Sequence, residues 1–167
     1  MLSKRRFIAL AATTLTGAAA ARLLNAAPAS AASGETFEIM KTEQEWRAVL
    51  TDEQFAVMRK EATERPFTSP LNDEKRAGVF HCAACDLPLF SSEAKFDSGT
   101  GWPSFYEALP DAVAYRTDFK LIYPRKEEHC ARCGGHLGHV FNDGPPPTGK
   151  RHCINGVALV FKPAEEA

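Results

Sequence analysis

The chain has 167 residues, of which 44% are hydrophobic and 25% are charged. These ordinary values exclude a disordered, collagen-like or coiled-coil protein, and the length allows one domain with a leader or tail. Residues 1–31 hold four basic side chains and no acidic one, which leaves 16 basic against 21 acidic residues, a net charge of −5, for residues 32–167. An acidic body argues against a protein that binds nucleic acid through its phosphates.

The first 31 residues have the layout of an export signal. A basic start at Lys4-Arg5-Arg6 precedes about 15 residues rich in Ala, Leu and Thr, a run too short to span a membrane. The paired arginines resemble the twin-arginine signal, which carries folded proteins across a bacterial inner membrane. Ala29-Ser30-Ala31 fits a cleavage site, with Ala27-Pro28-Ala29 as the alternative. We therefore expect a periplasmic protein that meets a membrane only during export, although an uncleaved anchor or a buried Ala-rich helix would have a similar composition.

The next part of the chain predicts two short helices followed by a β core. Between residues 36 and 64, two Thr-x-x-Glu/Gln sequences have the capping-box spacing that begins a helix, and Pro66 is expected to end the second helical stretch. Beyond Pro66, short apolar runs bounded by Gly, Pro or Asp predict an antiparallel sheet. These runs are residues 78–80, 112–115, 119–123 and 157–161. The Pro- and Gly-rich residues 143–149 predict a loop.

Four of the five cysteines form two Cys-x-x-Cys pairs separated by 44 residues: Cys82, Cys85, Cys130 and Cys133. Two such pairs can place four thiolates at the corners of a tetrahedron, the geometry of a structural zinc ion. With four protein ligands the zinc has no open position for a substrate, so the site is predicted to be structural rather than catalytic. Two redox dithiols or two disulfides also use paired cysteines, but a disulfide across so short a spacing is strained.

The fifth cysteine, Cys153, follows the predicted loop and precedes an apolar run. Neighbouring Arg151 and His152 can lower the pKa of its thiol by favouring the thiolate, which is the nucleophilic form. A free cysteine is also among the most frequently buried side chains. This segment alone therefore leaves open whether Cys153 is a nucleophile or a buried structural cysteine.

Two further motifs carry candidate functional side chains. His136 and His139 lie three residues apart, and either imidazole can protonate a leaving oxygen near neutral pH. As a metal site the two histidines lack a nearby carboxylate partner. Trp102 stands in a Gly-flanked turn, where it is either a core aromatic or one wall of a pocket.

Together these motifs resemble the B-type methionine sulfoxide reductase family, the methionine-R-sulfoxide reductases. The resemblance runs from about Thr42 to Phe161 and includes Thr-Glu-Arg-Pro-Phe at residues 63–67, both Cys-x-x-Cys pairs, Phe-Ser-Ser at 90–92, Ser-Gly-Thr-Gly-Trp-Pro-Ser-Phe at 98–105, His-Leu-Gly-His-Val-Phe at 136–141 and Arg-His-Cys-Ile-Asn at 151–155. It implies a mainly β fold of two antiparallel sheets in a β-tent-like arrangement, with the active site on one sheet and the zinc at the far side. It also implies that residues 32–167, with a core at about 38–162, reduce the R epimer of methionine sulfoxide, free or within oxidised proteins.

The resemblance also implies roles for individual residues. Cys153 would be the nucleophile, and His139 would bond the sulfoxide oxygen and donate a proton. Asn155 and His136 would help to position that network. Trp102 would pack against the S-methyl group of the substrate.

One position departs from the family pattern. Many members have a second, resolving cysteine where this chain has Thr100. Because four of the five cysteines are presumed zinc ligands, we predict a one-cysteine cycle in which an external thiol attacks the sulfenic acid on Cys153. The donor would be a thioredoxin-like protein, a glutaredoxin-like protein or a small thiol. Two other classes share these features, namely a zinc-containing binding module and a thiol–disulfide oxidoreductase that uses the paired cysteines.

Overall fold

The computed structural model describes residues 35–119 and 123–164. The predicted export signal at residues 1–31 therefore lies outside the described residues. Within the described ranges, no helix is long and apolar enough to cross a membrane.

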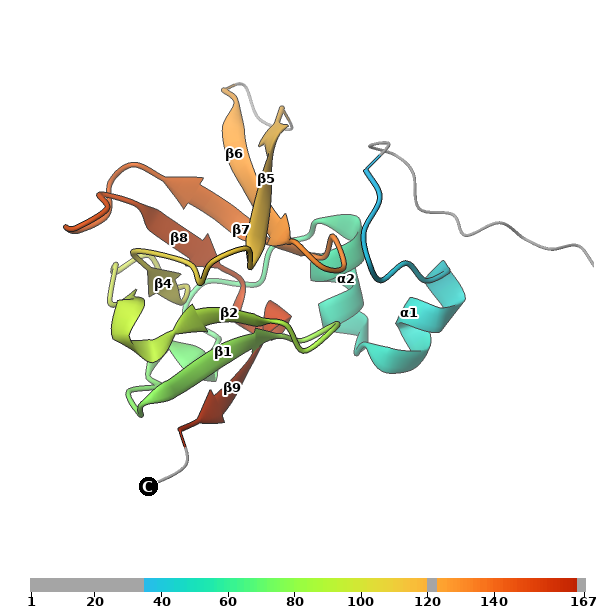
Figure 1. Cartoon of the computed structure of the whole chain (residues 1–167), viewed down its shortest axis with the longest axis horizontal. Coiled ribbons are helices and arrows are strands. Elements are labelled where there is room, and N and C mark those ends of the chain that lie inside the picture. Colours follow the sequence, from blue (N-terminus) through green and yellow to red (C-terminus); the bar gives the residue numbers. More distant parts are fainter. Residues whose placement is uncertain (1–34, 120–122, 165–167) are drawn as a thin grey trace, which may run out of the picture.

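Two short helices begin the described part of the chain, α1 (Glu43–Val49) and α2 (Asp52–Lys60). Both predicted capping boxes form, with each threonine hydroxyl accepting from a backbone N–H and the Glu or Gln side chain accepting in return. The second helix ends at Lys60, earlier than the predicted stop at Pro66, because Glu61 takes a left-handed backbone conformation with φ of 54°. The two helices lie together at one side of the molecule (Figure 1).

In the described ranges, nine strands form two antiparallel sheets (Figure 1). The three-stranded sheet has the order β2-β1-β9, and the six-stranded sheet has the order β3-β4-β8-β7-β6-β5. The strands and the 3₁₀ helix η3 are β1 Gly78–Cys82, β2 Pro88–Ser91, β3 Lys95–Phe96, β4 Ser104–Phe105, β5 Val113–Asp118, β6 Arg125–Cys130, β7 His136–Phe141, β8 Arg151–Ile154, η3 Gly156–Ala158 and β9 Leu159–Pro163. The predicted fold class, mainly β with two antiparallel sheets and two short helices, is confirmed.

Three buried phenylalanines join the two sheets. Phe80 of β1 and Phe90 of β2 come from the smaller sheet, and Phe105 of β4 comes from the larger one. The rings of Phe90 and Phe105 stack with centroids 4.4 Å apart, and the Phe80 ring lies 5.0 Å from that of Phe105. Because Phe105 is paired with His152 of β8, this packing also holds the strand that carries Cys153.

Two of the predicted apolar strands are placed differently in the structure. Within residues 119–123, Phe119 and Tyr123 are exposed and belong to no strand, and the three residues between them lie outside the described part. The run at residues 157–161 begins in η3 and becomes strand only from Leu159. The predicted loop at residues 143–149 is confirmed, since it contains no helix or strand.

Strand β6 was not among the predicted strands. Its sequence, Arg-Lys-Glu-Glu-His-Cys, has no alternation of apolar and polar residues, which is the signal of a half-buried strand. The structure nevertheless buries Glu127 and Glu128, because Glu127 accepts hydrogen bonds from His129 and His136 and Glu128 accepts one from His152. Paired, hydrogen-bonded charges of this kind are tolerated inside a protein.

Candidate active site and metal site

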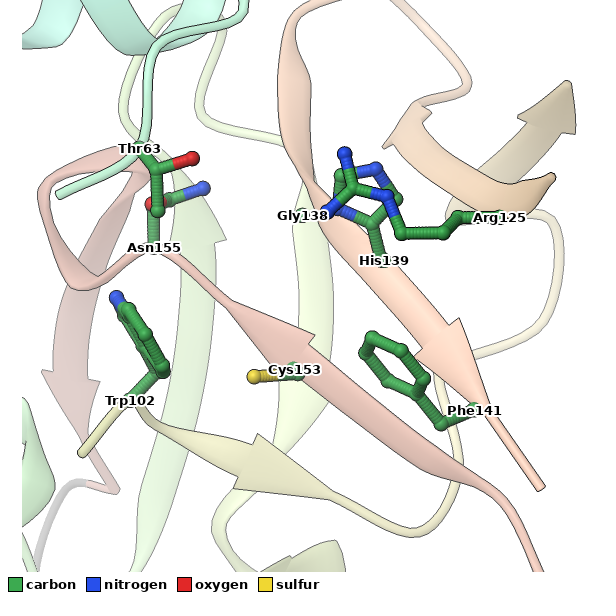
Figure 2. Close-up of a pocket in the computed structure, with 8 residues that line it drawn as sticks. All are labelled: Thr63, Trp102, Arg125, Gly138, His139, Phe141, Cys153 and Asn155. Carbon is green, nitrogen blue, oxygen red and sulfur yellow. The ribbon is translucent and has the colours of Figure 1, made fainter. Parts of the chain in front are cut away.

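Strand register places Cys153 directly beside His139. On the paired strands β7 and β8, His139 lies opposite Cys153, and on the other side of β8, Ser104 of β4 lies opposite Cys153. Side chains of directly opposed residues share one face of a sheet. The thiol and the imidazole therefore open into the same pocket, of about 110 Å³, which is lined by Thr63, Trp102, Arg125, Gly138, His139, Phe141, Cys153 and Asn155 (Figure 2).

The thiol of Cys153 is partly buried. Burial raises its pKa, while the Thr100 hydroxyl and the Arg151 guanidinium lower it without overcoming the effect of burial. The Oγ1 atom of Thr100 lies 3.8 Å from the sulfur. The free thiol is therefore mainly protonated at neutral pH, beside two groups that stabilise a thiolate once it forms.

The expectation that His152 lowers the thiol pKa is wrong. Successive residues of a strand point to opposite faces, so His152 faces away from the pocket that contains Cys153. Its Nδ1 atom bonds Oε1 of Glu128 at 2.8 Å, and both side chains are buried. His152 therefore belongs to the interior between the sheets.

Arg151 is held as a fixed cation on the same face as Cys153. Its Nε and Nη2 atoms bond the two carboxylate oxygens of Asp143 at 2.9 and 2.8 Å. The guanidinium carbon lies 4.4 Å from the centroid of the Phe141 ring, which lines the pocket. A bidentate pair with a stacked ring restricts the guanidinium to one orientation, near the position where a thiolate charge would develop.

A carboxylate orients the imidazole of His139. Its Nε2 atom lies 2.8 Å from Oδ2 of Asp118, and the same oxygen accepts from Nη2 of Arg125 at 2.6 Å. Because a carboxylate only accepts, Nε2 carries the proton in this pair. Burial lowers the pKa of His139, the charges of Arg125 and His136 lower it further, and Asp118 opposes them.

His136 stands behind His139 and is not among the residues that line the pocket. The two imidazole rings meet edge to face with centroids 5.5 Å apart. Nδ1 of His136 lies 2.7 Å from Oε1 of Glu127, a carboxylate that also bonds His129 and Arg116. Burial raises the pKa of Glu127, but hydrogen bonds from the two histidines outweigh it and bring the pKa to about 2. Glu127 therefore stays negatively charged at neutral pH, in direct contact with His129 and His136.

Trp102 and Asn155 both bond the backbone of Glu64. The indole Nε1 of Trp102 donates to the Glu64 carbonyl at 2.9 Å, and Oδ1 of Asn155 accepts from the Glu64 N–H at 2.8 Å. The Asn155 amide nitrogen donates to the carbonyl of Leu137 at 2.8 Å. Trp102 lines the pocket and is only partly buried, so it is a pocket wall rather than a core aromatic. Glu64 was not a predicted site residue; the only signal was its place in the Thr-Glu-Arg-Pro-Phe sequence.

Three hydroxyls form a short chain beside the thiol. The Ser98 hydroxyl lies 2.8 Å from the hydroxyls of both Thr100 and Ser104. From the sequence, Thr100 was predicted only to occupy the position of the resolving cysteine. The structure shows that a side chain at position 100 reaches the sulfur of Cys153.

The four paired cysteines lie together at a second place in the fold. Their sulfur atoms are all within 4.8 Å of one another, with separations of 3.8 Å between Cys82 and Cys133 and 3.5 Å between Cys85 and Cys130. In a tetrahedral zinc site the sulfurs are about 3.8 Å apart, because each Zn–S bond is about 2.3 Å long. The donor set fits structural zinc, as predicted. None of the four lines the pocket that contains Cys153.

The metal site joins the two sheets. Cys82 ends β1 and Cys85 lies in the turn to β2 of the smaller sheet, whereas Cys130 ends β6 and Cys133 lies in the turn to β7 of the larger sheet. All four are free thiols in the structure, so neither pair is a disulfide. A zinc ion bound here would link the sheets at one point.

A thiol that faces an imidazole across two strands is typical of enzymes that work through a cysteine. The SelR domain profile matches residues 50–163 of this chain. The peptide methionine sulfoxide reductase MsrB of Pseudomonas putida (strain W619) is 57% identical over 131 residues, which cover 78% of this chain and 98% of the relative. MsrB of Methanosarcina barkeri (strain Fusaro / DSM 804) is 55% identical over 129 residues, 77% of this chain and 91% of the relative. The chain belongs to the MsrB family of peptide methionine sulfoxide reductases, which are oxidoreductases.

Proposed function

We propose that the protein reduces the R epimer of methionine sulfoxide, free or within oxidised proteins, with Cys153 as the nucleophile. The observation that carries this proposal is that Cys153 and His139 are directly opposite each other on paired strands and line the same pocket. In Figure 2, Trp102 lies on one side of the thiol, and His139 and Phe141 lie on the other. Such a pocket offers a nucleophile, a proton donor and an aromatic surface to one small substituent.

The chemistry needs these three groups together. In the proposed complex the S-methyl group packs against Trp102, the sulfoxide sulfur faces Cys153 and the oxygen faces His139. The proton of the Cys153 thiol passes to Nδ1 of His139, and the thiolate attacks the sulfoxide sulfur while Nδ1 gives that proton to the sulfoxide oxygen and Asp118 retains the proton on Nε2. The attack forms an S–S bond; the protonated oxygen then moves to the Cys153 sulfur as the substrate S–O bond and this S–S bond break, giving methionine and a cysteine sulfenic acid. The substrate sulfur gains the two electrons that the Cys153 sulfur loses.

The reductant in this cycle is an external thiol. Thr100 occupies the place beside Cys153 from which a resolving thiol would act, and the other four cysteines gather at the metal site. One thiol attacks the sulfenic acid and releases water, leaving a mixed disulfide on Cys153. A second thiol then releases Cys153 and the oxidised donor. A thioredoxin-like protein, a glutaredoxin-like protein or a small thiol can serve as the donor.

The stereochemical part of the proposal is tested with separated epimers. Purified protein with dithiothreitol under anaerobic conditions is expected to consume the R epimer of a peptide methionine sulfoxide and to leave the S epimer unchanged. Only one epimer can place its methyl group on Trp102 and its oxygen at His139 at the same time. Chiral chromatography of the remaining sulfoxide measures the result, and equal consumption of both epimers would contradict it.

The pH dependence follows from the two shifted groups. Burial moves the pKa of His139 below its usual 6.5 and the pKa of Cys153 above its usual 9.0. The reactive form has one proton shared between the pair, so activity is lost below the lower pKa, where both are protonated, and above the upper pKa, where neither is. We expect single-turnover reduction to have a flat rate between pH 7 and 8 and to fall only at more acidic and at more alkaline pH. A fall already between pH 7 and 8 would contradict this assignment.

We also propose that residues 1–31 direct export to the periplasm, by the twin-arginine route. The layout of this segment supports the proposal. Intact-mass measurement on protein from a periplasmic fraction is expected to show loss of about the first 31 residues, as signal cleavage requires. A mass that still includes Met1 would refute cleavage.

A further inference from the structure

Glu64 is a buried residue that takes no part in the proposed reaction, although it bonds two walls of the pocket. The residue is only 5% exposed. We propose that Glu64 is a positioning residue that sets the space between Trp102 and the Cys153 thiol, and so determines which S-alkyl group the enzyme accepts. The inference rests on the proposed function, since it requires that the alkyl group of the sulfoxide packs against Trp102.

The backbone of Glu64 connects two separate segments of the site. Its carbonyl accepts from the indole of Trp102, which precedes β4, and its N–H donates to the amide of Asn155, which follows β8. Figure 2 shows Trp102 and Asn155 on the same side of Cys153, next to Thr63. A displacement of the Glu64 backbone therefore moves the hydrogen-bond partners of Trp102 and Asn155 at the same time.

The carboxylate of Glu64 fixes that backbone in place. Its Oε2 atom accepts from the N–H of Gly156 at 2.5 Å and from the N–H of Val157 at 3.4 Å, at the first residues of η3. A Cβ atom added at Gly156 would lie 1.8 Å from Oγ of Ser69 and 3.3 Å from the same Glu64 oxygen. This close packing leaves the carboxylate one position only. The length of the Glu64 side chain therefore sets the distance between the Glu64 backbone and Gly156.

The consequence is a pocket of fixed width. An aromatic wall discriminates between a methyl and an ethyl group only if it cannot move away, and one methylene in a rigid apolar pocket changes kcat/KM by about 10- to 200-fold. The wild-type protein is therefore expected to prefer methionine sulfoxide over ethionine sulfoxide by at least about 10-fold. Once the Glu64 carboxylate no longer reaches Gly156, the indole follows the displaced carbonyl and the preference falls.

Two substitutions separate side-chain length from charge. Glu64→Asp keeps the charge but is one methylene shorter, so its carboxylate cannot reach Gly156 without moving the backbone. Glu64→Gln keeps the length and an acceptor oxygen but removes the charge. We expect Glu64→Asp to reduce the methyl-to-ethyl ratio of kcat/KM at least about fivefold and Glu64→Gln to keep it within about twofold of wild type.

The experiment measures kcat and KM for the R epimers of the N-acetyl methylamides of methionine sulfoxide and ethionine sulfoxide, with dithiothreitol as reductant. Glu128→Asp is the matched control, because it shortens another fully buried carboxylate that bonds His152 rather than a pocket residue. The methyl-to-ethyl ratio of kcat/KM in Glu128→Asp is expected to equal that of wild type even if the thermal stability of the variant falls. Thermal unfolding and the alkylation rate of Cys153 are measured for each variant.

The outcomes are distinct. Equal losses for both sulfoxides in Glu64→Asp, or the same change of ratio in Glu128→Asp, would show that Glu64 only supports the fold and would overturn the inference. If Glu64→Asp does not fold, Trp102→Phe removes the indole donor and leaves Glu64 intact; an unchanged ratio there would equally overturn it. A wild-type protein that reduces neither sulfoxide refutes the proposed function itself.

Discussion

Replacing Cys153 by serine is expected to abolish methionine sulfoxide reduction, with a loss of at least about 10⁴-fold, as is found when a catalytic nucleophile is removed. Serine has nearly the same size, but its hydroxyl is a weak nucleophile at neutral pH and cannot accept the sulfoxide oxygen as a sulfenic acid does. No other thiol lines the pocket, since the remaining cysteines gather at the metal site. The measurement is methionine released from the R epimer in a single turnover.

A matched control for this variant is Thr100→Ser, which keeps a hydroxyl beside the sulfur. Its activity is expected to stay within about tenfold of wild type, because only a methyl group is lost. Both variants are expected to retain zinc and the wild-type melting temperature, since neither changes a metal ligand or the packing of Phe80, Phe90 and Phe105. Turnover by Cys153→Ser within tenfold of wild type would show that another residue is the nucleophile.

Replacing Cys130 by serine is expected to prevent stable folding. Cys130 is fully buried at the end of β6, and it is one of two ligands that the larger sheet contributes. Structural zinc supplies about 10–16 kcal/mol in small metal-dependent domains, which equals or exceeds the total stability of about 5–15 kcal/mol typical of a domain. Loss of the ion therefore removes the link between the sheets and leaves thiolates buried without a cation.

Zinc content by elemental analysis and circular dichroism during thermal unfolding measure this effect. The wild type is expected to bind one zinc per chain and to lose its cooperative transition when a strong chelator removes the ion. Cys153→Ser is the matched control, since it makes the same chemical change at a cysteine outside the metal site. Folded wild-type protein without stoichiometric metal, or a Cys130→Ser variant that unfolds like wild type, would refute the assignment.

The surroundings of Cys153 show where prediction from sequence was limited. Arg151 and His152 are both neighbours of Cys153 in sequence, but only Arg151 shares its face of the sheet. Side chains of any strand alternate between its two faces. Which face of β8 lines the pocket, however, depends on the pairing of β8 with β7 and β4. The sequence therefore singled out the segment that contains Cys153 without deciding which charges act on its thiol.

Strand β6 and Glu64 illustrate the same limit for buried charge. Four of the six residues in β6 are charged, and the strand is buried only because histidines from β6, β7 and β8 bond its two glutamates. Glu64 is buried because backbone N–H groups at residues 156 and 157 bond its carboxylate. These partners lie between 2 and 93 residues away along the chain and meet the glutamates only in the folded sheets, so polarity alone indicates an exposed position for each of the three glutamates.

By itself the sequence determined the helix starts and the four cysteines that gather at the metal site, and it predicted that no further thiol is left to react with Cys153. Each is a local pattern or a count: capping boxes act within one turn, a Cys-x-x-Cys turn presents two sulfurs without help from the rest of the fold, and five cysteines are simply counted. The tertiary structure alone decided that His139 opposes Cys153, that His136 stands behind it on Glu127, and that Glu64 connects Trp102 to Asn155. These relations depend on strand register and on long-range hydrogen bonds, which exist only after the two sheets have packed together.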